Sequence, residues 1–191
     1  TLLPGFSGSA VLDADGLNAA ADLLPYMGKM LHPKSELILT PHPGEMARLT
    51  GRSAAEINAD REGMALRYAK VWNAVVVLKG AHTVIAGPDG RCAVNPTGNP
   101  GLSRGGSGDV LAGMTSALLA CGLPAFEAAA CAVYLHGAAA DRAAADRGPR
   151  PGADAGDRRD RRPAAGDPRD APEHRRRPGR ALRRAPSEDN P

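Results

Sequence analysis

The chain has 191 residues, a formal net charge of +3, 42% hydrophobic residues and only 3% aromatic residues. The length suits one domain of good size or two small ones, and no run of about 18 apolar residues indicates a membrane span. The few aromatic residues are not interleaved with basic ones, which argues against a platform that stacks single-stranded nucleic acid.

The positive charge is concentrated near the C-terminus. Residues 146–191 contain 13 arginines and 9 acidic residues, whereas residues 1–145 contain 11 basic and 12 acidic residues. The first part is therefore nearly neutral, and we expect neither nucleic acid nor a membrane as a partner. Cys92, Cys121 and Cys131 form an odd set without CxxC spacing, and the N-terminus lacks a secretory-signal pattern. We expect no disulfide, no metal site built from cysteine, and a cytoplasmic location.

Residues 146–191 are expected to form a disordered tail rich in Arg, Pro and Asp. Leu182 is their only large aliphatic residue, so burial cannot offset the entropy of ordering them. Three interpretations are open: a basic tail that binds nucleic acid, a solvated tail, or a segment translated out of frame from GC-rich DNA. We favour the third because Arg, Ala, Pro, Gly and Asp dominate. A continuous reading frame in the gene would exclude it.

Residues 1–145 alternate between strand and helix patterns and are expected to form the folded domain. Apolar runs predict strands at 9–15, 36–40 and 73–80, and a hairpin at 82–95 around Pro88–Gly90. Helical patterns follow at 16–24, 53–72, 108–120 and 124–145, and a Ser53–Glu56 capping box opens the second of them. This alternation predicts an α/β domain with a mostly parallel sheet, whose ligands lie beyond the carboxyl ends of the strands.

One loop combines glycines with a single acid immediately before a helix. In this glycine loop, residues 105–109, Gly105, Gly106 and Gly108 surround Ser107 and precede Asp109. Backbone N–H groups at the start of a helix form a ready anion site, so the loop predicts a phosphate cradle. Asp109 is a candidate base that takes a proton from a hydroxyl group. The alternative is that this acid only favours the helix dipole.

Two further loops carry candidate ligands. Lys79 ends an apolar strand, and Gly80 and Thr83 beside it suit a nucleotide phosphate or ribose; a lysine that simply reaches water is the alternative. His42 lies between two prolines, which fix its direction, so it is a candidate ligand; an ordinary surface histidine is the alternative. Glu45 is interpreted as an acid in the early turn of the next helix.

Three other polar residues have structural interpretations. Asp13 and Asp15 close the first strand and are expected to cap the helix at Gly16, with a phosphate-side or water-mediated metal role as the weaker alternative. His136 is expected to be a helix residue packed against the core.

Taken together, the motifs resemble a known family. "VLDADGLN", "LTPHPGEMARLTG", "VVLKGAHTVIAGPDG", "NPTGNPGLSRGGSGDVLAGM" and "AVYLHGAAAD" occur here in the order and spacing of the ADP/ATP-dependent (S)-NAD(P)H-hydrate dehydratases. These belong to the carbohydrate-kinase-like (YjeF C-terminal) family of the ribokinase-like superfamily. The resemblance covers residues 9–145 and implies a three-layer α/β/α domain. It also indicates a domain that is incomplete at both ends, with β-sheet edge and apolar surface left open.

The resemblance implies a repair enzyme that phosphorylates the C6 hydroxyl of hydrated NADH or NADPH and then eliminates phosphate to restore the cofactor. Asp109 would be the base and contact the substrate, together with His42. Mg²⁺ would accompany ADP, or ATP, as the phosphoryl donor. The residues implied to hold the nucleotide are Lys79, Gly80, Ala81, His82, Thr83, Gly105, Gly106, Ser107 and Gly108. The family also implies a homotetramer and a separate NAD(P)H-hydrate epimerase as a partner in repair.

Two alternatives to the dehydratase remain open from the sequence. One is a small-molecule kinase of the same superfamily, of the hydroxyethylthiazole-kinase type, against which the "TPHPGE" loop argues. The other is an inactive fragment that binds nucleotide weakly or does not fold. A stable phosphorylated alcohol as product would indicate the kinase, and the absence of cooperative melting would indicate the fragment.

Overall fold

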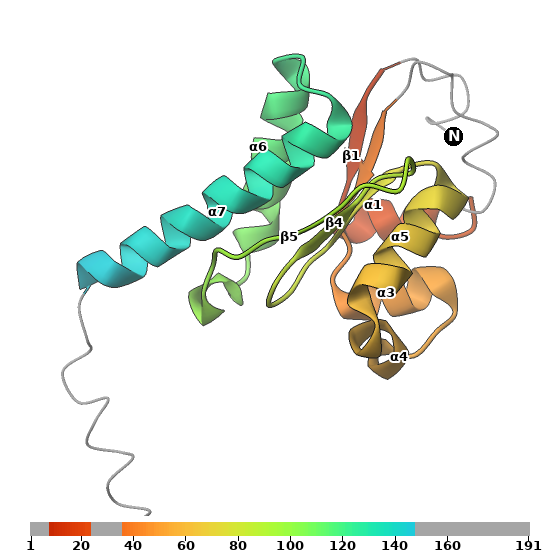
Figure 1. Ribbon diagram of the computed structural model, residues 1–191, viewed down its shortest axis with the longest axis horizontal. Helices are drawn as coiled ribbons and strands as arrows, with labels where there is room; N and C mark the ends of the chain where they lie inside the picture. The colour runs from red at the N-terminus through yellow and green to blue at the C-terminus, as the bar shows by residue number, and fades with distance from the viewer. Residues whose placement is uncertain (1–7, 24–35, 148–191) are drawn as a thin grey trace, which may run out of the picture. The chain divides into compact units, whose positions relative to one another are not determined.

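A computed structural model of the chain describes residues 8–23 and 36–147. The predicted tail lies outside the described residues except for its first two, and so does the last residue of the helix predicted at 16–24. Figure 1 shows a sheet with helices on both of its faces. No helix within the described ranges is both long and apolar enough to cross a membrane.

The sheet follows the chain order β1-β2-β3-β4-β5. The strands are β1 (Ala10–Leu12), β2 (Leu37–Leu39), β3 (Val75–Leu78), β4 (Val84–Ala86) and β5 (Cys92–Val94). β1, β2 and β3 are parallel, with Ile38 opposite both Val11 and Val75. β4 and β5 form the predicted hairpin and add antiparallel pairs, so the sheet is mixed. β1 forms one edge of this sheet.

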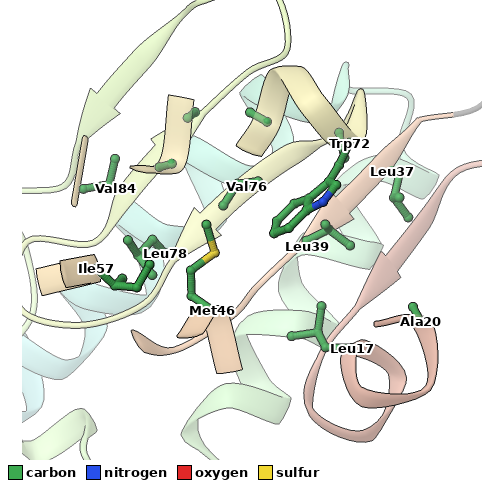
Figure 2. Packing of buried hydrophobic residues seen from close by; sticks show 14 residues of the cluster. Leu17, Ala20, Leu37, Leu39, Met46, Ile57, Trp72, Val76, Leu78 and Val84 are labelled. Carbon is green, nitrogen blue, oxygen red and sulfur yellow. The ribbon is translucent and has the colours of Figure 1, made fainter. Parts of the chain in front are cut away.

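Alternate strand residues separate two cores on the two faces of the sheet. On one face pack α1 (Ala14–Ala20), α3 (Pro43–Thr50), α4 (Ala54–Ala59) and α5 (Arg61–Trp72). Figure 2 shows Met46 and Trp72 from these helices lying over Leu39 and Val76 of the sheet. Each of these four side chains is at most 1% exposed, which places them in the centre of this core.

The opposite face is covered by α6 (Ser107–Ala120) and α7 (Ala125–Arg147). Their side chains pack on the strand residues that point the other way, Ile38, Val75, Val77 and Ile85. The α/β/α layers expected from the resemblance are therefore confirmed. Both helices begin and end within two residues of the predicted limits.

The helix predicted at 53–72 is in fact two helices, and this prediction was wrong. Asp60 has φ −143° and ψ 71°, which ends α4, and its carboxylate accepts a hydrogen bond of 2.9 Å from Gly63 N–H to begin α5. The new cap satisfies an N–H group that the break would otherwise leave unpaired. The Ser53–Glu56 capping box is confirmed, with reciprocal bonds of 3.2 and 2.9 Å.

Candidate active site at the carboxyl end of the parallel strands

The predicted motifs converge where the three parallel strands end. Backbone hydrogen bonds continue the strand pairing just beyond the last strand residues. Thr40 N–H donates to Leu12 C=O at 3.1 Å, and Lys79 N–H donates to Pro41 C=O at 2.8 Å. Residues far apart in the sequence are thereby fixed side by side at one edge. This edge is where open α/β sheets bind their ligands.

Lys79 is the centre of this arrangement. Its ammonium group donates a 2.5 Å hydrogen bond to Asp13 Oδ1 and lies 3.7 Å from Glu45 Oε2. The three side chains are only 20, 14 and 13% exposed, so Lys79 does not simply reach water. Two carboxylates and one ammonium group carry a formal charge of −1, which a bound cation would offset.

The expectation that the Asp13 side chain caps the first helix was wrong. Asp13 occupies the N-cap position of α1, but its side chain makes no capping bond, and Gly16 N–H bonds to the Asp13 carbonyl at 2.9 Å. The ammonium of Lys79 is a stronger partner for this carboxylate because the pair is charged and largely shielded from solvent. The expectation that Asp15 closes the strand and caps the helix was also wrong, because α1 begins at Ala14 and Asp15 is an exposed residue in its first turn.

His42 is held by the helix that it begins. Its Nδ1 accepts hydrogen bonds from Gly44 N–H at 3.0 Å and Glu45 N–H at 3.2 Å, while Glu45 Oε2 accepts from His42 N–H at 2.7 Å. Glu45 is thus the early-turn acid that the sequence predicted. Because Nδ1 is an acceptor, the neutral ring carries its proton on Nε2. The side chain is 56% exposed and Nε2 lies 3.6 Å from Glu45 Oε1, which is longer than a hydrogen bond, so this donor can still reach a ligand.

The start of α6, which follows the glycine loop, also lies at the carboxyl end of the parallel strands. Gly106 has φ 83° and caps α6 without a side chain. Ser107 N–H bonds to Arg104 C=O and Val110 N–H to Gly106 C=O. The N–H groups of Gly108 and Asp109 have no acceptor within the part of the chain that the structure describes. Such free N–H groups at a helix start can bind an anion.

Gly108 lies directly against the Lys79–Asp13 pair. A Cβ atom at Gly108 would stand 3.3 Å from Asp13 Oδ2 and 3.6 Å from Lys79 Nζ. Glycine therefore keeps this side of the helix start clear between two charged groups. Asp109, the next residue, is exposed in the first turn of α6.

The predicted nucleotide loop, residues 79–83, forms a tight turn after β3. Gly80 has φ 146° and His82 has φ 54°, and Thr83 Oγ1 donates a 3.0 Å bond to Gly80 C=O. Ala81 and His82 are exposed. The Thr83 hydroxyl thus donates its only proton within the loop, and its oxygen can still accept a hydrogen bond from a ligand.

Arg61 supports this loop, and the sequence analysis missed it. Its guanidinium donates to the carbonyls of Leu78 at 2.8 Å and Lys79 at 3.2 Å, and lies against Gly80. Burial lowers the pKa of Arg61, which nevertheless remains a cation. Within a predicted helix, an arginine is usually a solvent-exposed residue, so nothing in the sequence gave reason to expect this contact with the loop.

His136 lies beside the glycine loop. Its Nε2 lies 3.4 Å from Ser107 Oγ, and the ring is half-buried. Burial lowers the pKa of His136, which favours the neutral ring at pH 7. No group of three or more His, Cys, Asp or Glu residues that could hold a metal ion occurs among residues 8–23 and 36–147.

The geometry of this site is typical of one class of protein. Free N–H groups at a helix start, a lysine and a nearby carboxylate meet beyond parallel strands, which is the arrangement of an α/β domain that handles phosphoryl groups. A family model described as NAD(P)H-hydrate dehydratase matches residues 5–158. The chain belongs to this family.

Individual relatives agree with this assignment. The bifunctional NAD(P)H-hydrate repair enzyme Nnr of Moorella thermoacetica is 54% identical over 78% of this chain and 28% of its own length. The ADP-dependent (S)-NAD(P)H-hydrate dehydratase of Neisseria meningitidis is 48% identical over 69% of this chain and 44% of its own length. The chain therefore spans less than half of the curated relatives it matches.

A solved structure confirms the fold class. The ADP/ATP-dependent NAD(P)H-hydrate dehydratase of Bacillus subtilis, co-crystallised with ATP and Mg²⁺, superposes with a TM-score of 0.63 at 41% identity. The match covers 71% of this chain and 46% of that one. The resemblance noted from the motifs is thus confirmed, and these relatives support the dehydratase rather than a hydroxyethylthiazole-type kinase.

Proposed function

We propose that this chain carries the phosphoryl-transfer part of an ADP-dependent (S)-NAD(P)H-hydrate dehydratase. The observation that carries the proposal is the packing of the α6 start against the Lys79–Asp13 pair, with Asp109 in the first helical turn. Family membership supports the choice of substrate. Nucleotide, Mg²⁺ and hydrated NAD(P)H are ligands proposed for this chain.

The chemistry starts from a poor leaving group. The C6 hydroxyl of the hydrated nicotinamide would lose its proton to the Asp109 carboxylate while its oxygen bonds to the terminal phosphorus of ADP, which leaves AMP. The electron pair of the ring nitrogen would then expel the ester oxygen as inorganic phosphate. Loss of the C5 proton to water would let the C5–H electron pair form the C5=C6 double bond and return the nitrogen pair. Overall, hydrated cofactor and ADP yield reduced cofactor, AMP and phosphate.

The N–H groups of Gly108 and Asp109 would stabilise the charge on the transferred phosphoryl group. The Nε2–H group of the His42 side chain would bind the substrate, because the cap on α3 fixes the orientation of the ring. Residues 79–83 and the glycine loop would hold the adenine nucleotide. Arg61 holds the loop 79–83 in place by donating hydrogen bonds to the carbonyls of Leu78 and Lys79.

The residues present fit Mg²⁺ brought by the nucleotide. Only Oδ1 of Asp13 bonds to Lys79; Oδ2 lies 3.3 Å from the Cβ position of Gly108, so a hard oxygen donor remains beside the anion site. Asp13 would hold the ion through water. When bound, Mg²⁺ neutralises phosphate charge. A homotetramer and cooperation with an NAD(P)H-hydrate epimerase belong to the same proposal.

Replacing Asp109 tests the proposal directly. Asp109→Asn is expected to lower the turnover of S-hydrated NADPH at least 10³-fold, because the base is lost, while ADP binding measured by calorimetry changes less than threefold. Glu62→Gln is the matched control, since Glu62 is also an exposed acid in the first turn of a helix. Equal turnover in the two variants would show that Asp109 only favours the helix dipole.

A further inference from the structure

The loop that leads into α6 is anchored to α7. This connecting loop, residues 95–102, follows β5. Thr97 Oγ1 donates a 3.0 Å hydrogen bond to Tyr134 C=O. Gly98 N–H donates to Asp141 Oδ2 at 2.8 Å, and Asn99 Nδ2 donates to Asp141 Oδ1 at 2.9 Å. Both carboxylate oxygens of Asp141 therefore bind a segment that is 42 or 43 residues away in the sequence.

Backbone packing brings the same two segments together. A Cβ atom at Gly137 would stand 2.8 Å from Thr97 C and 2.9 Å from Gly98 N. Gly98 itself has φ 104°, a conformation that favours glycine. Tyr134, Gly137 and Asp141 are spaced three and four residues apart, so they share one face of α7.

Asn99, which binds Asp141, also caps the short helix that precedes the glycine loop. Asn99 is the N-cap of the 3₁₀ helix η1 (Pro100–Leu102), and its Oδ1 accepts a 2.9 Å hydrogen bond from Gly101 N–H. Gly106 and Ser107 follow only a few residues later. On the same helix, His136 lies 3.4 Å from Ser107. Hence residues 134–141 of α7 hold the segment 97–107 at both of its ends.

We propose that Asp141 is a positioning residue that fixes the glycine loop for phosphoryl transfer. It contacts the connecting loop and acts on the reaction only through it. The inference rests on the proposed function and extends it to a residue outside the substrate-contacting set. The two donated hydrogen bonds lower the pKa of Asp141, so it is a carboxylate at neutral pH and acts as an acceptor for both donors.

A donor–acceptor swap tests this role in the 191-residue chain. Asp141→Asn keeps one acceptor but sets its NH₂ group against the NH₂ group of Asn99. The double variant Asp141→Asn/Asn99→Asp restores a donor facing an acceptor. Asp146→Asn is the matched control, because Asp146 lies on the same helix and, within residues 8–23 and 36–147, makes one exposed ion pair, with Arg142.

We expect Asp141→Asn to lower kcat/KM for ADP-dependent turnover at least tenfold and to speed amide exchange in residues 97–107 at least tenfold. The double variant should recover most of both losses, and Asp146→Asn should show neither. Amide exchange in β3 should stay unchanged in all variants.

Two outcomes would overturn the inference. One is kinetics and exchange in Asp141→Asn that match Asp146→Asn. The other is a loss in Asp141→Asn that spreads to β3 exchange and is not recovered in the double variant, which would show a merely structural role. If the unmodified chain lacks turnover, the proposed function fails by itself. The amide exchange of residues 97–107 then still decides whether Asp141 holds the loop.

Discussion

Gly137→Ala is the substitution whose effect the structure predicts most sharply. Alanine is normally the better helix former by about 0.8–1.0 kcal/mol, so an alanine within α7 should stabilise the chain. At this position, however, the new methyl group would meet Thr97 C at 2.8 Å and Gly98 N at 2.9 Å. Both are backbone atoms and cannot move aside as a flexible side chain would.

Gly113→Ala provides the matched control on α6. Gly113 is an exposed helix residue, and apart from its chain neighbours and the backbone of its own helix, no heavy atom of the described residues lies within 4 Å of its Cβ position. It should therefore gain about 0.8–1.0 kcal/mol from helix propensity alone. Gly137→Ala has the same gain but also an overpacking cost of about 1–3 kcal/mol. The free energies of unfolding of the two variants should then differ by about 1–3 kcal/mol, with Gly137→Ala the less stable.

Urea unfolding followed by circular dichroism measures both variants against the unmodified chain. The m-values should be similar, so that the midpoint reports the free energy. Amide exchange should show that the loss in Gly137→Ala is greatest at residues 97–99. Equal stabilisation by both alanines would refute the close contact between α7 and the connecting loop.

Three further predictions concern other parts of the domain. Asp60→Ala removes the cap that begins α5 and should cost about 1 kcal/mol in the free energy of unfolding. Lys79→Met leaves the shielded Asp13 carboxylate unpaired and should cost about 1–3 kcal/mol, part of which Asp13→Asn in the same chain should recover; no recovery would contradict the pairing. Because burial lowers the pKa of His136, the unfolded chain binds the extra proton first, so stability should fall below about pH 6.5. Unfolding at pH 7.5 and 5.5 should show a smaller drop in His136→Gln.

Local chemistry made much of the fold predictable. The all-apolar run at Val75–Leu78 indicated a buried strand, and the turn residues Pro88–Gly90 indicated the hairpin. The capping box at Ser53 could be predicted because its two partners lie three residues apart in the sequence. The break at Asp60 was not, because an aspartate inside an otherwise continuous helical pattern is compatible with a solvated helix position.

Much of the site's geometry depends on contacts between distant residues, which no local pattern records. Asp13 and Lys79 are 66 positions apart, and their pairing replaced the predicted helix cap. Asp141 and Arg61 are charged residues on helices, and each has the sequence signature of a solvated face. Only the folded chain shows that they hold the loops that carry the predicted ligands.

The proposed dehydratase activity can be measured as recovery of reduced-nicotinamide absorbance from S-hydrated NADPH, with purified chain, Mg²⁺ and ADP. We expect recovery that requires ADP, releases AMP and phosphate, and is lost in Asp109→Asn. A stable phosphorylated product would contradict the elimination step and indicate a kinase. No recovery with either ADP or ATP, from a chain that unfolds cooperatively, would contradict the proposed activity of this chain.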